Sequence, residues 1–209
     1  HGANDLTDNN TVLSAAGIIG DGADFERSNS ENLSAADNAS LSVTGDWSTS
    51  FWFKPETNSS GCLFSKWEDA GTQRGILALI GTGGQVSPSP GSTFPSDITT
   101  SLNLTNGVWS HLAFVFDASA SQVYVYKDGV LNDTLTGYGT NVYDNTAPFK
   151  LGAYNTISAP LDGILDEFGY WSRVLTGADV TSLYNGGAAL PYEAAAAPTT
   201  YSLTVNAAD

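Results

Sequence analysis

Short apolar segments, separated by Gly, Asn, Asp, Ser and Pro, recur along nearly the whole chain. Segments of this length with turn residues between them are typical of a β-sandwich or barrel, and not of alternating strands and helices. Residues 108–116 are the most informative, because a strand here would carry apolar side chains on both of its faces. Such a strand is expected at the centre of a sheet that is covered on each side. The pattern therefore predicts an all-β fold in two layers.

The segment that follows predicts a hairpin. Residues 122–127 alternate Tyr with Val, and Asp128-Gly129 comes next, before two more apolar residues. Glycine tolerates the positive φ that a tight hairpin turn requires, so Asp-Gly between alternating segments indicates such a turn. Residues 50–54 predict a further strand, with two Phe on one face and Trp52 on the other.

One short helix is expected near the C-terminal end. Thr176 and Asp179 have the spacing of a capping box, in which each side chain satisfies a backbone N–H of the other residue. Val180 and Leu183 then form an apolar stripe, and Gly186 suits the left-handed residue that ends a helix. We expect this helix to close one edge of the sandwich.

The charge of the chain is strongly one-sided. Asp and Glu number 22 against 7 Lys and Arg, which gives a formal net charge of −15 at pH 7. A field of this sign repels nucleic acids and anionic membrane surfaces, so we exclude both as partners and expect a secreted or cell-surface protein. No apolar run approaches the ~20 residues that a membrane-spanning helix needs. Cys62 is the single cysteine, which excludes an intrachain disulfide, and its apolar neighbours predict a buried thiol.

The C-terminal end differs in composition from the rest of the chain. We expect residues 1–190 to form one domain, and residues 191–209 to form a linker and a strand-forming tail. Within the tail, residues 201–206 alternate like a lone strand, which is not stable by itself. It would pair with this domain, with a following domain or with a neighbouring subunit, so self-association through residues 198–209 is one open alternative. The absence of Met indicates processing or excision from a larger protein.

Three segments carry a further signal in their order and spacing. They are residues 17–33, with Ala-Asp-Phe-Glu at 23–26; residues 108–129, which open Val-Trp-Ser-His-Leu-Ala-Phe-Val; and residues 161–186, which open Leu-Asp-Gly-Ile-Leu-Asp-Glu-Phe. Together they resemble the laminin-G-like, concanavalin A-like jelly-roll family. The resemblance implies two antiparallel sheets in an extracellular protein. Family members usually open with an additional strand that is missing here, and residues 201–206 are candidates to replace it, in cis or by donation between subunits.

The same resemblance implies a metal site. In related jelly rolls a structural cation lies where an early loop meets the last core strand, and the matching groups are the Asp166 carboxylate and carbonyls near Ser30 and Glu31. Calcium takes about six to eight hard oxygen ligands, which an acidic loop can supply. The alternative is that Asp166 and Glu167 only accept hydrogen bonds from backbone N–H groups at a strand end.

Aromatic residues in the loops suggest a carbohydrate site. Aromatic rings stack on the faces of sugars, and short polar side chains orient the sugar hydroxyls. Loop aromatics are also often half-buried packing residues, and Trp52, Trp109 and Trp171 fall within strand patterns that place them in the core. The predicted ligand-binding residues are Trp67, Asp69, Tyr143, Asn145, Tyr154 and Asn155.

The sequence lacks the motifs of jelly-roll enzymes. Hydrolases of the laminarinase type need Glu-x-Asp-x-x-Glu on one face of a strand, and no such run occurs. Asp166 and Glu167 are expected on opposite faces of their strand, which does not suit a catalytic pair. His111 lies among apolar residues and is explained as a hydrogen-bonded core residue, not as a member of a serine triad.

These observations predict a non-catalytic extracellular recognition module that binds a glycan or another cell-surface ligand. The alternative is a structural subunit of an extracellular filament, surface layer or virion, assembled through the terminal strand. The two differ in whether the protein binds sugar and in whether its tail drives self-association.

Overall fold

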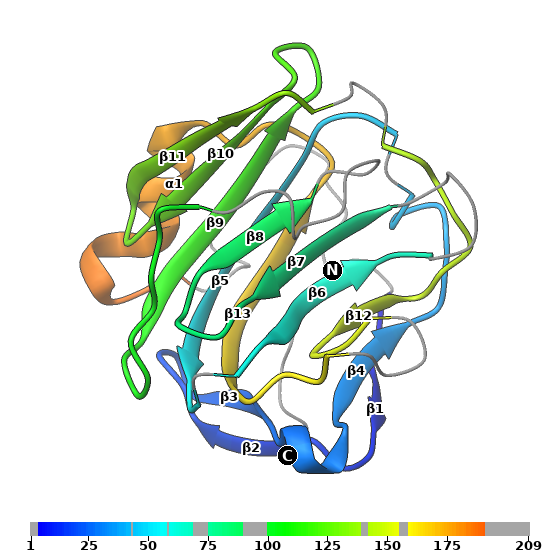
Figure 1. Ribbon diagram of the computed structural model, residues 1–209, viewed down its shortest axis with the longest axis vertical. Helices are drawn as coiled ribbons and strands as arrows, with labels where there is room; N and C mark the ends of the chain where they lie inside the picture. The colour runs from blue at the N-terminus through cyan, green and yellow to red at the C-terminus, as the bar shows by residue number, and fades with distance from the viewer. Residues whose placement is uncertain are drawn as a thin grey trace.

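The computed structural model describes residues 4–42, 44–57, 59–68, 75–89, 100–138, 142–154 and 159–190. Two antiparallel sheets face each other (Figure 1). The six-stranded sheet has the order β1 (Thr7–Asn9), β4 (Asn32–Ala35), β12 (Phe149–Leu151), β6 (Gly61–Lys66), β7 (Ile76–Ile80) and β8 (Val86–Ser89). The seven-stranded sheet has the order β11 (Val130–Thr136), β10 (Gln122–Lys127), β9 (Ser110–Asp117), β5 (Trp47–Pro55), β13 (Gly163–Trp171), β3 (Asp21–Phe25) and β2 (Leu13–Ala16). The predicted two-sheet sandwich is confirmed.

Phenylalanine rings fill the space between the sheets. Phe51 on β5 stacks on Phe168 of β13 with ring centroids 5.4 Å apart, and meets Phe114 of β9 edge to face at 5.7 Å. Across the gap, Phe64 of β6 lies 6.1 Å from Phe51. All four rings are fully buried. Because burying one such side chain stabilises the fold by roughly 1.5–3 kcal/mol, this cluster holds the two layers together.

The central strand β9 is buried on both faces, as its sequence predicts. Its inner face joins the core between the sheets, while Ala113 and Val115 point outward. There they pack with Val180 and Leu183 of the helix α1 (Gly177–Tyr184). The helix therefore packs on the outer face of the seven-stranded sheet next to its edge strand β11, which agrees in part with the expectation that it closes an edge. The helix packs there because β9 and its neighbours present an apolar outer surface that only a second layer can bury.

Both local signals at turns and helix ends are confirmed, with one shift. Thr176 and Asp179 form the capping box, and Asn185, with φ 49°, is the left-handed residue that ends α1 one position before Gly186. The short 3-10 turn η3 (Asn185–Gly187) follows. At the β10–β11 hairpin, Asp128 and Gly129 have φ of 50° and 77°.

A bulge interrupts β13 opposite β5. The register shifts between Asp166 and Gly169, and Glu167 has a left-handed φ of 49°. Asp166 pairs with Trp52, and Glu167 lines a small cavity that Trp52 also lines. The two acids therefore do not alternate across the sheet, and the expectation of opposite faces is wrong because the extra residue breaks the period of two.

The early segments of the family resemblance lie in different sheets. Residues 21–25 form β3 of the seven-stranded sheet, and residues 32–35 form β4 of the six-stranded sheet, with the 3-10 turn η1 (Arg27–Asn29) between them. The tail at 191–209 lies outside the described residues, so its pairing stays a prediction. In the part of the chain that is described, no helix is long and apolar enough to cross a membrane.

Candidate functional site

Three carboxylates gather where β3 and β5 end. Asp24 belongs to β3, Glu26 follows that strand, and Glu56 follows β5. Their carboxylate oxygens lie within 4.8 Å of one another. The two strands do not pair directly, but Ile164 of β13 pairs with Asp24 on one side and with Lys54 on the other. The register of β13 thus brings together acids that are about 30 residues apart in the sequence.

Burial and the crowding of negative charge raise the pKa of two of these acids. Burial raises the pKa of Asp24, and the nearby carboxylates of Glu31 and Asp162 raise it further, whereas Lys54 lowers it. Burial likewise raises the pKa of Glu56, with added repulsion first from Asp24 and then from other acids. Oδ1 of Asp24 is buried and has no hydrogen-bond partner among the described residues. A divalent cation would relieve the repulsion and satisfy this oxygen, since hard oxygen ligands suit Ca²⁺.

The side chains of Asp166 and Glu31, near the predicted calcium site, accept hydrogen bonds from backbone N–H groups. Oδ2 of Asp166 accepts hydrogen bonds from the N–H groups of Ile18 at 2.7 Å and Ile19 at 3.0 Å, and Oδ1 accepts one from Glu167 at 2.8 Å. Oε2 of Glu31 accepts a bond of 2.7 Å from the N–H of Glu26. Asp166 and Glu31 therefore stabilise two different loops, the first before β3 and the second after it.

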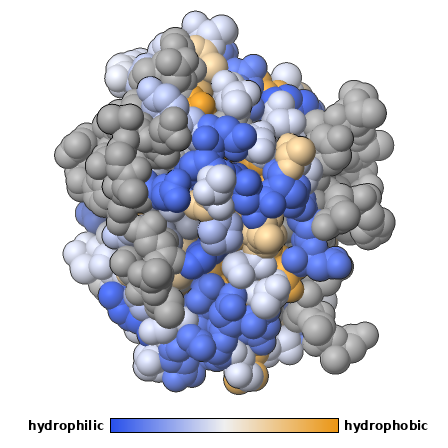
Figure 2. All heavy atoms as spheres, turned by 90° about the vertical axis from the view of Figure 1, so that its right-hand side faces the viewer, coloured by the Kyte–Doolittle hydropathy of each residue, from blue (hydrophilic) through white to orange (hydrophobic). Residues whose placement is uncertain are grey.

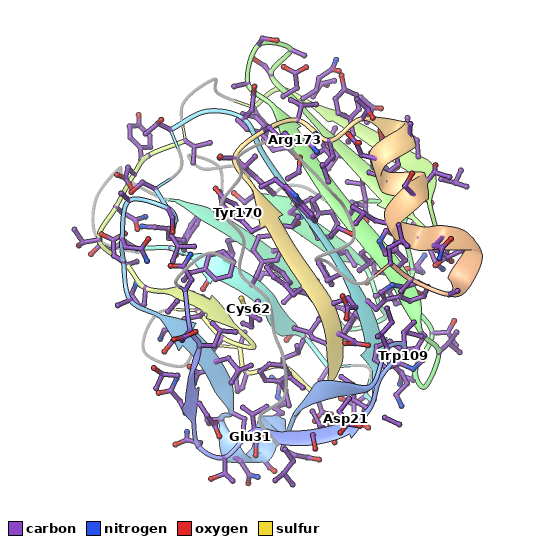
Figure 3. All side chains as sticks on the ribbon, turned by 180° about the vertical axis from the view of Figure 1, so that it is seen from behind. Asp21, Glu31, Cys62, Trp109, Tyr170 and Arg173 are labelled. Atoms are coloured by element: carbon purple, nitrogen blue, oxygen red, sulfur yellow. The ribbon has the colours of Figure 1, made fainter. Side chains whose placement is uncertain are left out.

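Of the predicted carbonyl ligands near Ser30 and Glu31, the Ser30 carbonyl accepts bonds from the Asn10 and Asn32 side-chain amides at 3.1 and 3.3 Å. Glu31 lies at the same end of the sandwich as Asp21 (Figure 3). Sequence reasoning missed the Asp24, Glu26 and Glu56 group. A signal for its first two members was present, because Asp-Phe-Glu puts two acids on one face of a strand.

The predicted glycan residues divide into a buried layer and a surface layer. Trp67 is only 2 % exposed and packs with Cys62 and Leu77 on the six-stranded sheet. Tyr154 is half-buried and packs against the same cluster. Tyr143 is also half-buried. Asp69 and Asn155 lie outside the described residues.

Asn145 belongs to the buried layer through Lys66. Nζ of Lys66 donates to the carbonyl oxygen of Asn145 and forms ion pairs with Asp37 at 2.8 Å and with Asp144 at 3.7 Å. Nδ2 of Asn145 donates to the Lys66 carbonyl at 3.4 Å. Lys66 is 2 % exposed, so this cation ties the end of β6 to the loops at Asp37 and Asp144. The structure thus brings Trp67, Tyr154 and Asn145 close to one short stretch of β6.

His111 and Ser50 form a buried pair beneath α1. Nε2 of His111 lies 2.8 Å from Oγ of Ser50, and Nδ1 is buried without a partner among the residues that are described. The adjoining cavity of about 10 Å³ has room for about one water molecule. Burial lowers the pKa of His111 to about 4. A substrate has no room here, so the pair is structural.

Two of the three tryptophans expected in the core are buried there, and so is the single cysteine. Trp52 and Trp171 are buried as expected, but Trp109 is half-buried outside the core, with Nζ of Lys54 5.4 Å from its ring centroid. Cys62 is buried, and burial raises the pKa of its thiol far above the usual range.

The family follows from comparison with known proteins. Residues 27–181 match the model of the concanavalin A-like lectin/glucanases superfamily. The chain belongs to this superfamily. The match extends from η1 into α1 and contains strands of both sheets, whereas β1, β2 and β3 precede it. No curated protein matches the sequence at a significant level.

Solved structures share the fold. Domain 4 of AbnA, an extracellular arabinanase from Geobacillus stearothermophilus, in complex with arabinotriose, has a TM-score of 0.63 at 24% identity over 85% of this chain and 86% of that one. A heptameric SAP-like pentraxin from Limulus polyphemus has a TM-score of 0.53 at 15% identity, over 81% and 84% of the two chains. The ligand-binding domain of botulinum neurotoxin serotype D, in complex with N-acetylneuraminic acid, has a TM-score of 0.65 at 14% identity, over 88% and 46%.

Proposed function

We propose that this chain is an extracellular, non-catalytic recognition module that binds carbohydrate. The observation that carries the proposal is the superfamily match over residues 27–181, combined with a shared fold along 85% of the chain with a domain bound to arabinotriose. A second structural relative holds N-acetylneuraminic acid. Since one fold can host many functions, the residues of the site must carry the rest of the argument.

For the site we propose the loops around Trp67. Tyr143 and Tyr154 are half-buried, Tyr154 packs against the buried cluster of Trp67, and Asn145 is fixed by its bond to Lys66. Asp69 and Asn155 are proposed to add polar contacts, as the sequence predicts. Partly exposed rings over a fixed, buried layer are suited to stack on sugars, because little side-chain entropy is lost on binding.

The test is direct binding of oligosaccharides, beginning with arabinotriose and extending to a panel of plant and animal glycans. Tyr154→Ala and Tyr143→Ala should each weaken binding about tenfold, which is the usual worth of one stacked ring. Tyr124→Ala is the matched control, because Tyr124 is also half-buried but lies on β10 of the other sheet. Equal loss of affinity in all three variants would contradict the placement of the site, and no binding in the whole panel would contradict the function.

We propose no hydrolytic activity at the cluster of Asp24, Glu26 and Glu56, called the acidic group below, although the superfamily includes glucanases. Retaining hydrolysis needs two carboxyl groups about 5–5.5 Å apart with the sugar between them. The oxygens of Asp24, Glu26 and Glu56 are closer together than this. Release of reducing sugar from a bound polysaccharide, lost in Glu56→Gln, would overturn the proposal.

We further propose that the acidic group holds a structural Ca²⁺. The support is the spacing of Asp24, Glu26 and Glu56, their mutual repulsion, and the unpartnered Oδ1 of Asp24. The set of Ser30, Glu31 and Asp166 stays a prediction, in which the Asp166 carboxylate would serve a cation in addition to three backbone N–H groups.

At about 100 times its dissociation constant, a bound ion stabilises a protein by about 2.7 kcal/mol, which would raise the melting temperature by about 5–10 °C at this chain length. Differential scanning fluorimetry with Ca²⁺ and with a chelator measures the shift. Glu56→Gln should remove it, and Asp5→Asn, an exposed acid elsewhere, should keep it. Identical melting curves with ion and with chelator would exclude the site.

The structural-subunit alternative stays a prediction. Its test is the molecular mass in solution with and without residues 198–209. An assembly that dissociates on truncation, in a protein that binds no sugar, would favour it over recognition.

A further inference from the structure

We infer that the proposed carbohydrate site selects neutral oligosaccharides and rejects anionic ones. The inference rests on the proposed function and concerns the class of ligand. The structural relatives leave the class open, because one relative binds arabinotriose, a neutral sugar, and another binds N-acetylneuraminic acid, which carries a carboxylate. The charges around Trp67 distinguish the two.

Lys66 is the cation closest in sequence to the proposed site, and its charge is already engaged. Its side chain is 3% exposed, and Nζ is bound by Asp37, Asp144 and the Asn145 carbonyl oxygen. The side chains of Asp37 and Asp144 are 31% and 44% exposed. The surface of this trio is therefore anionic, while its positive charge lies underneath.

Two further acids follow Trp67 in the sequence, and one further lysine lies on the neighbouring strand β12. Glu68 follows Trp67 directly and is half-buried, and Asp69 comes next in the sequence. Lys150 of β12, whose neighbour across the strands is Ser65, is also half-buried, and burial lowers the pKa of its ammonium group. Among the described residues near Trp67, three acids (Asp37, Glu68 and Asp144) thus outnumber two lysines, and Asp69 and Arg74 follow in the sequence.

Charges elsewhere in the molecule add to the negative electrostatic field at the proposed site. Of the four remaining described cations, two lie beside acids: Arg173 pairs with Asp179 at 3.2 Å, and Lys54 lies among the acids of Asp24 and Glu56. The side of the sandwich where β4 and β12 lie is mostly hydrophilic, with only small hydrophobic areas (Figure 2). A neutral sugar meets hydrogen-bonding groups there, whereas an anionic sugar also meets repulsion from several carboxylates and from the net charge of −15.

One or two net negative charges about 7 Å from the ligand, close to water, are expected to weaken an anionic ligand about three- to sevenfold relative to its neutral analogue. The experiment compares a neutral sugar with its acidic analogue of the same length, by isothermal titration calorimetry at low salt. Galactotriose and trigalacturonate are such a pair, in which a carboxylate replaces the hydroxymethyl group of each residue, and arabinotriose is a further neutral probe. We expect the neutral member of a pair to bind more tightly, and the difference to shrink at about 1 M NaCl, where the screening length is only about 3 Å.

Asp144→Asn should narrow the difference, because it removes an exposed carboxylate while Lys66 keeps Asp37. Asp21→Asn is the matched control; it removes the same charge from β3 in the other sheet (Figure 3) and should leave the difference unchanged. An anionic sugar that binds as tightly as its neutral partner, or a preference that salt and Asp144→Asn do not alter, would overturn the inference alone. No binding by any sugar would instead overturn the proposed function.

Discussion

His111 is the side chain through which we expect mild acid to destabilise this protein. Its imidazole is 1% exposed beneath α1, and burial lowers its pKa from 6.5 to about 4. The unfolded chain takes up a proton on this residue as the pH falls through 6.5, whereas the folded chain stays neutral until about pH 4. The contribution of neutral His111 to stability is therefore complete above pH 6.5 and is lost between 6.5 and about 4.

The magnitude follows from the two pKa values. The full loss is about 3 kcal/mol, since each unit of difference is worth about 1.4 kcal/mol, and about 2 kcal/mol of it is lost by about pH 5. Asp24 and Glu56 act in the opposite direction, because their raised pKa values let the folded chain bind protons more readily than the unfolded chain. The net pH dependence of the wild type therefore mixes several groups, and a variant is needed to isolate His111.

His111→Gln provides that comparison, because Gln does not titrate and its amide can still bond to Ser50. Urea unfolding followed by tryptophan fluorescence gives the free energy of unfolding of both proteins at about pH 7.5 and pH 5. We expect the advantage of the wild type over the variant to fall by about 2 kcal/mol on acidification. An advantage that stays constant across this range refutes the reasoning. If the variant does not fold, an NMR titration of His111 decides the matter, and a measured pKa near 6.5 is the refuting result.

Three further predictions concern local structure. Gly129→Ala should destabilise the protein by more than about 1 kcal/mol in chemical denaturation, because φ is 77° and the new Cβ would lie 2.9 Å from the Tyr184 ring; an unchanged midpoint would contradict this. Thr176→Ala should lose about 1 kcal/mol through the capping box of α1, whereas Thr134→Ala, at an exposed strand position, should cost less. Cys62 should not react with a thiol reagent until the protein unfolds, because its thiol is buried and its pKa is raised; rapid labelling of the native protein would disprove that.

Strands, turns and helix ends were predictable from the sequence where interactions between residues close in the chain determine them. The alternation of Tyr and Val predicted β10 at residues 122–127 with its correct bounds, and Asp128-Gly129 predicted the turn that follows. The capping box of Thr176 gave the start of α1. In each case the residues that interact are within four positions of one another, so the sequence displays the interaction directly.

The candidate sites were predictable only in part. Loop aromatics pointed to Trp67 and Tyr154, which do share one cluster, but the pattern did not indicate that Trp67 is buried beneath the surface. For the metal, the resemblance pointed to Asp166, whereas the described residues bring together Asp24, Glu26 and Glu56. Burial depends on what packs above a side chain, which no short window of sequence contains.

The sequence by itself determined which segments are strands, which strand faces are apolar, and that the surface is acidic. Tertiary structure alone decided where α1 lies, that β13 bulges at Glu167, and that the register of β13 draws Asp24 towards Glu56. It also decided that Lys66 is enclosed by Asp37 and Asp144, more than 70 residues apart from each other in the chain. The physical reason is that hydrogen-bonded turns and periodic side chains act over a few residues, whereas register, burial and charge clustering depend on strands that meet only when the two sheets close.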